Sequence, residues 1–225
     1  MVLTPELAEF VGILIGDGYI YTNKNKYIIG FTGSPITDKD YYEYVKELIR
    51  KVWKKEVTIK ERNKGLRIAF GSKEISDFLI NGLGLAHGID KSENIVIPEC
   101  ITKEWRLVKH SIRGIVDTDG SIFVAKKPGV IKYPSIEITT SSPKLALQLH
   151  GILTKNGFRV AKIWKYKSKL SKRTTYKVPL NGFENLDKWV REISFSNPYK
   201  LNRAKKALMG RGGFEPPTDP AQVKN

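Results

Sequence analysis

The stretch Phe10-Val11-Gly12-Ile13-Leu14-Ile15-Gly16-Asp17-Gly18 decides the fold of this chain, because a second stretch repeats its pattern. The second stretch is Ile112-Arg113-Gly114-Ile115-Val116-Asp117-Thr118-Asp119-Gly120. Each is a short apolar run with a glycine in its middle that closes on Asp-Gly, and the two final aspartates lie 102 positions apart. The repeat predicts two apolar helices whose terminal carboxylates meet on a pseudo-twofold axis.

The segments that follow each motif also repeat. We expect strands at 18–21, 27–31, 57–61 and 66–70 in the first half, and at 121–125, 135–140, 159–166 and 174–178 in the second. An amphipathic helix separates the strand pairs in both halves and follows a Ser-Pro step, Ser34-Pro35 or Ser142-Pro143. A further helix follows Gly71 and Gly182. The order αββαββα therefore occurs twice, which indicates an α+β fold built by internal duplication.

The domain boundaries follow from this repeat. We expect an N-terminal half over residues 1–86, a linker over 87–101 and a C-terminal half over 102–209. The tail 210–225 contains Pro216-Pro217 and has no apolar period, so it is predicted to be disordered.

Charge is unevenly distributed along the chain. The 39 Lys and Arg residues against 23 Asp and Glu residues give a formal net charge of +16. Residues 1–110 carry 17 basic and 15 acidic side chains, a balance of +2, whereas residues 111–225 carry 22 and 8, a balance of +14. This surplus favours a polyanionic partner, because each neutralised phosphate releases condensed counterions. A surplus that serves only solubility is the alternative.

Cysteine usage and hydropathy exclude several classes of protein. Cys100 is the single cysteine, so neither a disulfide framework nor a zinc-finger spacing is present. The N-terminus lacks the basic region and cleavage site of a signal peptide, and no apolar run reaches the ~18 residues that span a bilayer. We therefore expect a cytoplasmic, nucleoid-associated protein without a targeting signal or a membrane span.

The spacing of small residues predicts how the two motif helices meet. Gly12 and Gly16 share one helix face, and Gly114 and Thr118 repeat the spacing. Helices that pack on such faces approach closely, which would bring Asp17 and Asp119 side by side at two negative helix ends. A divalent cation relieves that repulsion, and hard oxygen ligands favour Mg²⁺. The alternative is that each Asp-Gly only begins a turn after a core helix.

Asp117 is predicted to have a different role from Asp119. It lies two residues earlier and so points to another side of the helix, and the first copy has Ile15 in its place. We expect Asp117 to be a packing or capping carboxylate.

Basic and aromatic side chains gather in the strands and turns that follow the motifs. Seven basic residues and no acidic one occur between Ala161 and Lys177. A two-stranded ribbon fits the major groove, where Lys and Arg contact phosphates or guanine edges; a solvated charged face is the alternative. The candidate DNA-binding residues are Tyr19, Tyr21, Lys24, Lys26, Lys60, Arg62, Lys64, Arg67, Lys126, Lys127, Lys132, Lys162, Lys165, Lys167, Lys169, Lys172, Arg173 and Lys177.

At the two motifs the chain resembles the LAGLIDADG homing endonucleases of the single-chain type, which carry both motif copies. Residues 84–91, Ile97-Pro98 and residues 113–121 are similar to the joint and second motif of archaeal intron- and intein-encoded members. Ser196-Asn197-Pro198-Tyr199-Lys200 resembles the segment that closes the second half. The resemblance covers residues 5–208.

This resemblance implies a saddle in which two antiparallel four-stranded sheets straddle DNA, with the motif helices packed at the centre. It implies that Asp17 and Asp119 bind the metal ions, two or three Mg²⁺ that Mn²⁺ or Ca²⁺ can replace in binding. The backbone carbonyls of Gly16 and Thr118 are implied as further ligands. It also implies a basic residue beside each scissile phosphate, and by position these are Lys91 and Lys200. Members of the family often carry a glutamine or a similar polar group on the strand before the Ser-Pro step. Thr32, Gly33, Thr140 and Ser141 occupy that region here, so the resemblance does not identify the group that positions water.

The implied activity is that of a monomeric, Mg²⁺-dependent enzyme that cuts a long double-stranded target in an intron-lacking allele and leaves short 3′ overhangs. The alternative is a maturase that binds its host intron RNA with the same saddle. No splice-junction residues are recognised at either end, which argues against an intein; an excised intein fragment is the alternative.

Overall fold

The computed structural model describes residues 2–62, 65–88, 91–127, 130–167 and 174–209. In the first half the order of elements agrees with the predicted αββαββα pattern. The elements are α1 (Pro5–Ile15), β1 (Gly18–Asn23), β2 (Lys26–Gly33), α2 (Lys39–Trp53), β3 (Lys60–Arg62), β4 (Gly65–Gly71), α3 (Lys73–Asp77) and the π-helical turn η1 (Phe78–Gly82).

The second half repeats this order and adds helices that the sequence patterns do not predict. Its elements are α6 (Trp105–Asp119), β5 (Gly120–Lys127), β6 (Val130–Thr140), α7 (Pro143–Lys155), β7 (Trp164–Lys167), β8 (Thr174–Asn181) and α8 (Phe183–Glu192). The additions are the short helices α4 (Lys91–Asn94) and α5 (Glu99–Thr102) between the halves, and the C-terminal helix α9 (Pro198–Met209). The tail predicted to be disordered, 210–225, lies outside the described residues.

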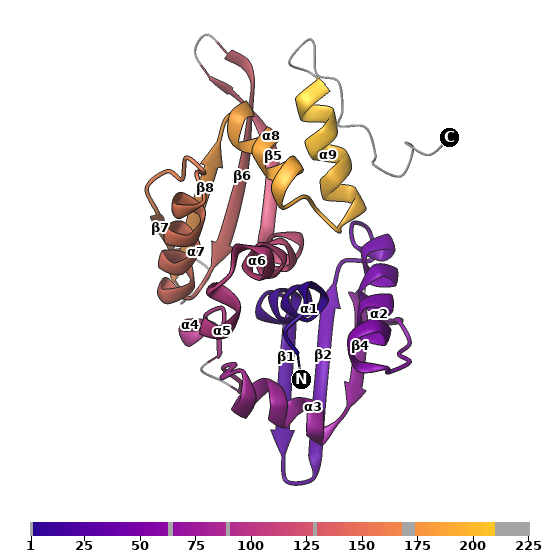
Figure 1. The fold of residues 1–225 in the computed structure, drawn as a ribbon. Helices are drawn as coiled ribbons and strands as arrows, with labels where there is room; N and C mark the ends of the chain where they lie inside the picture. The colour runs from indigo at the N-terminus through magenta and orange to yellow at the C-terminus, as the bar shows by residue number, and fades with distance from the viewer. Residues whose placement is uncertain (1, 63–64, 89–90, 128–129, 168–173, 210–225) are drawn as a thin grey trace, which may run out of the picture.

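Two antiparallel four-stranded sheets with equivalent topology confirm the predicted α+β fold. Their strand orders are β1-β2-β4-β3 and β5-β6-β8-β7. The registers are equivalent too, because Tyr19 pairs with Gly30 where Ser121 pairs with Glu137. The helices α1 and α6 lie against each other between the sheets, and the β1–β2 and β5–β6 hairpins extend in opposite directions (Figure 1).

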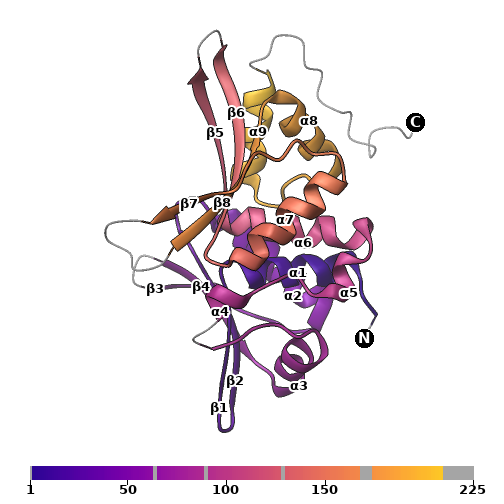
Figure 2. The same ribbon diagram turned by 90° about the vertical axis from the view of Figure 1, so that its left-hand side faces the viewer.

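Helices cover one face of each sheet and leave the other open. Figure 2 shows α1, α3, α5, α6 and α8 on one side of the strands. Alternate strand residues pack against them, such as Ile29 and Phe31 in the first sheet and Ile136 and Ile138 in the second, all at most 1% exposed. The residues between these in sequence lie on the helix-free faces. One hydrophobic core runs through both halves and both motif helices.

Local signals explain where the principal helices begin. The Thr4 hydroxyl accepts a hydrogen bond from Leu7 N at 3.2 Å, with Pro5 at the first helical position, as the sequence predicts. Ser142 caps α7 in the same way at 3.1 Å. After Ser34-Pro35 the helix begins later, at Lys39, because Asp38 accepts a hydrogen bond from Ser34 N at 2.9 Å and holds an intervening turn.

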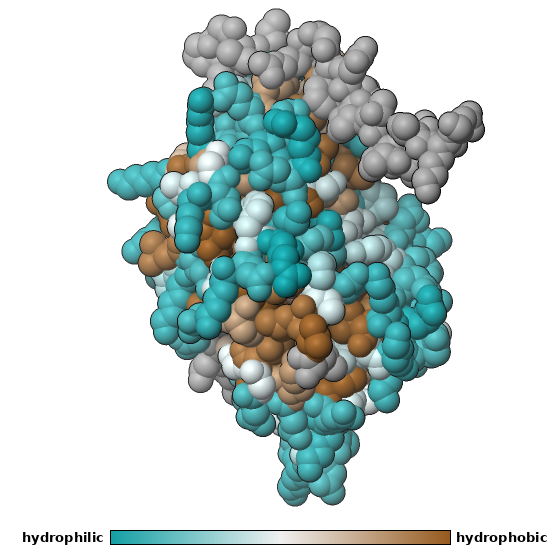
Figure 3. Space-filling view, in the orientation of Figure 1, coloured by the Kyte–Doolittle hydropathy of each residue, from teal (hydrophilic) through white to brown (hydrophobic). Residues whose placement is uncertain are grey.

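The helix-covered side of the molecule is mostly hydrophilic, with apolar residues gathered near the N-terminus and α3 and at the left edge over α7 (Figure 3). None of the helices in the described ranges is both long and apolar enough to span a membrane.

Candidate metal centre and nucleic-acid interface

The motif helices touch backbone to backbone. A Cβ atom added at Gly12 would lie 2.0 Å from the carbonyl oxygen of Ser111, and one added at Gly114 would lie 2.5 Å from that of Glu9. Any side chain at either position would push the helices apart. The small residues predicted from spacing therefore do form the contact between α1 and α6.

The same packing brings the ends of the two motifs together. A Cβ atom at Gly16 would lie 2.0 Å from Thr118 Oγ1 and 3.4 Å from Asp119 Oδ2. The Asp119 carboxylate thus lies against Gly16 of the first motif, the residue immediately before Asp17. The structure therefore joins Asp17, Asp119, Gly16 and Thr118 at one place, between the two sheets.

Lys200 of α9 reaches this place from the C-terminal end of the chain. Its ammonium donates to the carbonyl oxygens of Val116 at 2.7 Å and of Thr118 at 3.1 Å. Burial lowers the pKa of Lys200, and the carboxylates of Asp117, Asp38, Asp17 and Asp119 oppose that shift. The ammonium therefore offsets negative charge beneath both motifs.

Asp117 is the buried carboxylate behind this arrangement, in agreement with its predicted packing or capping role. It is 1% exposed, and its Oδ2 accepts a hydrogen bond from Ser196 N at 2.7 Å. Among the described residues its Oδ1 has no hydrogen-bond partner. Burial raises the pKa of the Asp117 carboxyl to about 7, and the nearby Lys200 charge opposes this.

Buried Asn197 and half-buried Ser196 hold the two halves together at this point. Asn197 Nδ2 donates to Asp38 Oδ1 of the first half at 3.3 Å and to the Asp117 carbonyl of the second at 3.4 Å. Its Oδ1 accepts from the backbone N–H groups of Tyr199 and Lys200 and so caps α9. Ser196 Oγ donates to Glu9 at 2.6 Å.

The oxygen atoms at the motif ends suit a hard cation such as Mg²⁺. Asp17 and Asp119 contribute carboxylates, and the last turns of two helices expose carbonyl oxygens. Within the described part of the chain no three His, Cys, Asp or Glu side chains cluster as a metal site, so carbonyl oxygens and water must complete the shell.

The first sheet presents its predicted DNA-binding residues on the open face. The Tyr19 ring lies over Gly30, where a Cβ atom would come within 2.4 Å of it. Arg67 Nε donates to the Tyr19 hydroxyl at 3.1 Å. Lys60 pairs directly with Arg67, and it shares this face with Arg62 on β3.

The second sheet places an acidic side chain in the equivalent region. Lys177 donates to Glu137 at 2.5 Å, and its ammonium lies 4.7 Å from the centre of the Trp164 ring. Lys165 faces the opposite way, because it lies over the Tyr176 ring and lines a pocket with Pro143 of α7. Among the residues 164–167, the aromatic Trp164 and Tyr166 therefore occupy the open face rather than the lysines.

The structure describes the side chains of some, but not all, of the remaining predicted DNA-binding residues. Tyr21, Lys24, Lys26, Lys126 and Lys132 are exposed on the β1–β2 and β5–β6 hairpins, and Lys162 is exposed before β7. Lys91 begins α4 and Lys127 ends β5, but the structure does not describe their side chains. The other predicted contacts, Lys64, Lys169, Lys172 and Arg173, lie outside the described residues.

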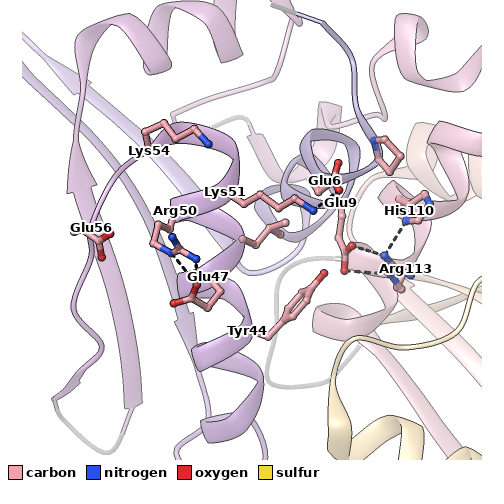
Figure 4. Close-up of a pocket in the computed structure, with 12 residues that line it drawn as sticks. Glu6, Glu9, Tyr44, Glu47, Arg50, Lys51, Lys54, Glu56, His110 and Arg113 are labelled. Atoms are coloured by element: carbon pink, nitrogen blue, oxygen red, sulfur yellow. Dashed lines mark hydrogen bonds and ion pairs between the residues drawn. The ribbon is translucent and has the colours of Figure 1, made fainter. Parts of the chain in front are cut away.

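An ion pair that the sequence reading missed joins the motif helices farther from their aspartates. Arg113 of α6 donates two hydrogen bonds to Glu9 of α1, whose side chain is 2% exposed (Figure 4). Both residues line a pocket of about 560 Å³ that neither Asp17 nor Asp119 reaches. The sequence does carry a signal for this pair. Glu9 is an acidic residue within the apolar first motif helix, and a buried acid requires a cation nearby.

Known proteins share this architecture. Residues 107–194 match the LAGLIDADG-like domain. The chain is 31% identical over 205 residues to a replication factor C small subunit of Thermococcus kodakarensis, covering 90% of the chain and 21% of that protein. It is 30% identical over 199 residues to the same subunit of Methanocaldococcus jannaschii, covering 88% and 10%. The chain thus spans about a fifth or less of these relatives.

Solved structures match nearly the whole chain. The homing endonuclease I-DmoI in complex with DNA and Ca has a TM-score of 0.60 at 18% identity, covering 90% of this chain and 96% of that one. I-WcaI bound to its DNA recognition sequence has a TM-score of 0.59 at 16% identity, covering 92% and 88%. The duplicated motifs, the two sheets and these matches agree, and the chain has the LAGLIDADG homing endonuclease fold.

Proposed function

We propose that the chain is a site-specific double-strand DNA endonuclease in which Asp17 and Asp119 hold the catalytic Mg²⁺. One observation carries the proposal: two helices in backbone contact deliver a carboxylate each to the junction of two open sheets. Two acids at two negative helix ends are unfavourable in a purely structural role and suit a cation site. The matched enzymes I-DmoI and I-WcaI have been solved bound to DNA.

Each residue of the site has a distinct task in this proposal. Asp17 and Asp119, with the carbonyl oxygens of Gly16 and Thr118, would hold Mg²⁺, which supplies a Lewis acid for phosphodiester hydrolysis. Lys200 offsets charge that develops on the phosphate, since its ammonium already lies among four carboxylates. Lys91 is proposed for the equivalent task in the other half.

The open faces of the two sheets form the proposed duplex-binding surface. Tyr19, Arg67, Lys60 and Lys177 lie on them, and the excess of basic residues after position 110 adds a phosphate-neutralising charge. We propose that the protein acts as a monomer, with 1–86 and 102–209 as the two DNA-binding halves. Cleavage across the minor groove with short 3′ overhangs follows the enzymes of this fold.

The relatives bear on the origin of the chain. Replication factor C small subunits align with it over 10–21% of their own length, as expected for an element embedded in a longer protein. This favours an intein as the source of the chain. We propose that the target lies in a host gene lacking the element, and a replication factor C small-subunit gene is the first to test.

The test is cleavage of a DNA library that includes such uninterrupted genes, with Mg²⁺ and with EDTA. The proposal expects metal-dependent double-strand cuts at one long sequence. Metal-independent cutting, or no cutting despite tight binding to duplex DNA, would overturn it. Tight binding to a host intron RNA without DNA cleavage would instead support the maturase.

A further inference from the structure

Equivalent basic residues on the two sheets have different hydrogen-bond partners. Arg67 on β4 and Lys177 on β8 occupy matching register positions, opposite Thr32 and Thr139 respectively. The neutral hydroxyl of Tyr19 accepts from Arg67, whereas the carboxylate of Glu137 accepts from Lys177. Gly30, the register equivalent of Glu137, has no side chain, and the Tyr19 ring fills its place. Among the described strand residues, an acidic side chain therefore lies on the open face of the second sheet and not on that of the first.

Glu137 faces the open side rather than the core. Its strand neighbours Ile136 and Ile138 are fully buried on the helix side, so alternation directs Glu137 the other way. On the partner strand Val178 is likewise buried, which puts Lys177 on the open face. The side chains of Glu137 and Lys177 are 12% and 24% exposed, and the Lys177 ammonium lies over the Trp164 ring.

A carboxylate on a duplex-binding surface has few favourable partners. DNA phosphates and deoxyriboses offer no hydrogen-bond donors, and phosphates repel a carboxylate. In the major groove the donors are the exocyclic amino groups of cytosine and adenine. Pairing with Glu137 also neutralises Lys177, so this lysine contributes little to general attraction for the backbone. Together the pair offers a carboxylate acceptor, from Glu137, beside the ammonium donors of Lys177. This combination matches the edge of a base pair, which presents both donors and acceptors.

We propose that Glu137 and Lys177 together read one G·C base pair in the half-site bound by the second sheet, Glu137 accepting from cytosine N4 and Lys177 donating to guanine O6 and N7. The inference rests on the proposed function as a DNA-binding enzyme. In a G·C pair the two acceptors adjoin each other beside the donor, so one ammonium reaches both. In an A·T pair the donor lies between the acceptors, so the same ammonium reaches only one.

The test measures binding in EDTA, which separates base reading from cleavage. After the target is selected from a duplex library, each base pair is replaced singly and affinity is measured by competition. The native protein is expected to lose roughly tenfold in affinity when one G·C pair becomes A·T. Glu137→Gln is expected to lose most of this discrimination, because a side-chain amide also matches adenine.

A second readout separates base reading from a structural role. Glu137→Gln frees the Lys177 charge, so its binding to non-specific DNA should strengthen and depend more steeply on salt. Glu184→Gln is the matched control, since Glu184 pairs with Arg159 at 2.6 Å through exposed side chains and should change neither profile. Equal thermal unfolding midpoints would show that each variant is folded, and Glu137→Ala provides a second variant.

A base-pair profile of Glu137→Gln identical to that of the native protein would overturn this inference and leave the endonuclease intact. Absence of any sequence preference in the native protein would overturn the proposed function as well.

Discussion

Two glycines determine how closely the motif helices approach, and hence whether their aspartates meet. Gly12→Ala would place a Cβ atom 2.0 Å from a backbone carbonyl oxygen that cannot rotate away. We expect this change to lower the free energy of unfolding by about 1–3 kcal/mol or more, because overpacking strains both helices. Urea unfolding measures the effect.

The control for Gly12→Ala is Gly151→Ala in α7, where an added Cβ atom has nothing within 4 Å. Helix propensity alone then acts, and it should raise the free energy of unfolding by about 0.5–1 kcal/mol. Equal effects of the two substitutions would contradict the account of the helix contact.

Asp117 makes stability depend on pH in a predictable direction. Burial raises its pKa from an ordinary acidic value to about 7, so the folded protein keeps a proton that the unfolded chain releases between about pH 4 and pH 7. This contribution to stability is present at low pH and is lost as pH rises through that window. The native protein should lose at least about 1 kcal/mol relative to Asp117→Asn between pH 5 and pH 8. A pH-independent difference between the two urea midpoints would contradict the assignment.

At the scale of elements, the principal helices and the succession of helices and strands along the chain could be predicted because their signals are local. Thr4, Pro5 and Ser142 begin helices as their side-chain chemistry dictates. One strand is misplaced: the sequence predicts it over residues 159–166, whereas β7 begins only at Trp164 and ends at Lys167. The backbone of Arg159 instead bonds to the Asn185 side chain, a long-range contact that no local pattern reveals.

The missed helix α9 shows the same limit for the site. Pro198 and the apolar positions 201, 204, 207 and 208 carry a helical pattern, but this single short stripe has no counterpart in the first half of the chain. Lys200 was found by position, whereas Ser196 and Asn197 were not, since their partners lie up to 187 residues away. The side of the sheet on which Lys165 lies also depends on packing against α7.

Asn197→Ala tests whether the α9 N-terminus positions Lys200. The change removes the cap of α9 and the hydrogen bonds to Asp38 and Asp117, so we expect about 1–2 kcal/mol of destabilisation. We also expect a drop of at least about tenfold in the single-turnover cleavage rate, because Lys200 loses its fixed position, with DNA affinity unchanged.

Thr4→Ala removes the cap of α1 and serves as the control, since its cost in stability is similar and Thr4 lies at the opposite end of α1 from Asp17. If both variants cleave at the native rate, Asn197 has only a structural role.

For the whole molecule, the pair Glu9–Arg113 couples the two halves through the motif helices. Arg113→Met leaves the Glu9 carboxylate buried without its cation, and we expect a loss of about 3–5 kcal/mol. Arg50→Met removes an exposed pair with Glu47 and should cost less than about 1 kcal/mol. Adding Glu9→Gln to Arg113→Met should recover part of the loss in urea unfolding; a further loss would show that the charge of Glu9 is compensated elsewhere.

The central claim is that Asp17 and Asp119, from two different halves, form one catalytic metal site. The most direct measurement compares cleavage of the selected target in Mg²⁺ by the native chain, Asp17→Asn and Asp119→Asn, with binding measured in parallel. Each substitution alone should abolish double-strand cleavage by at least about a hundredfold, because a ligand carboxylate is lost, while target affinity stays near that of the native chain. Full cleavage by either variant would contradict the account.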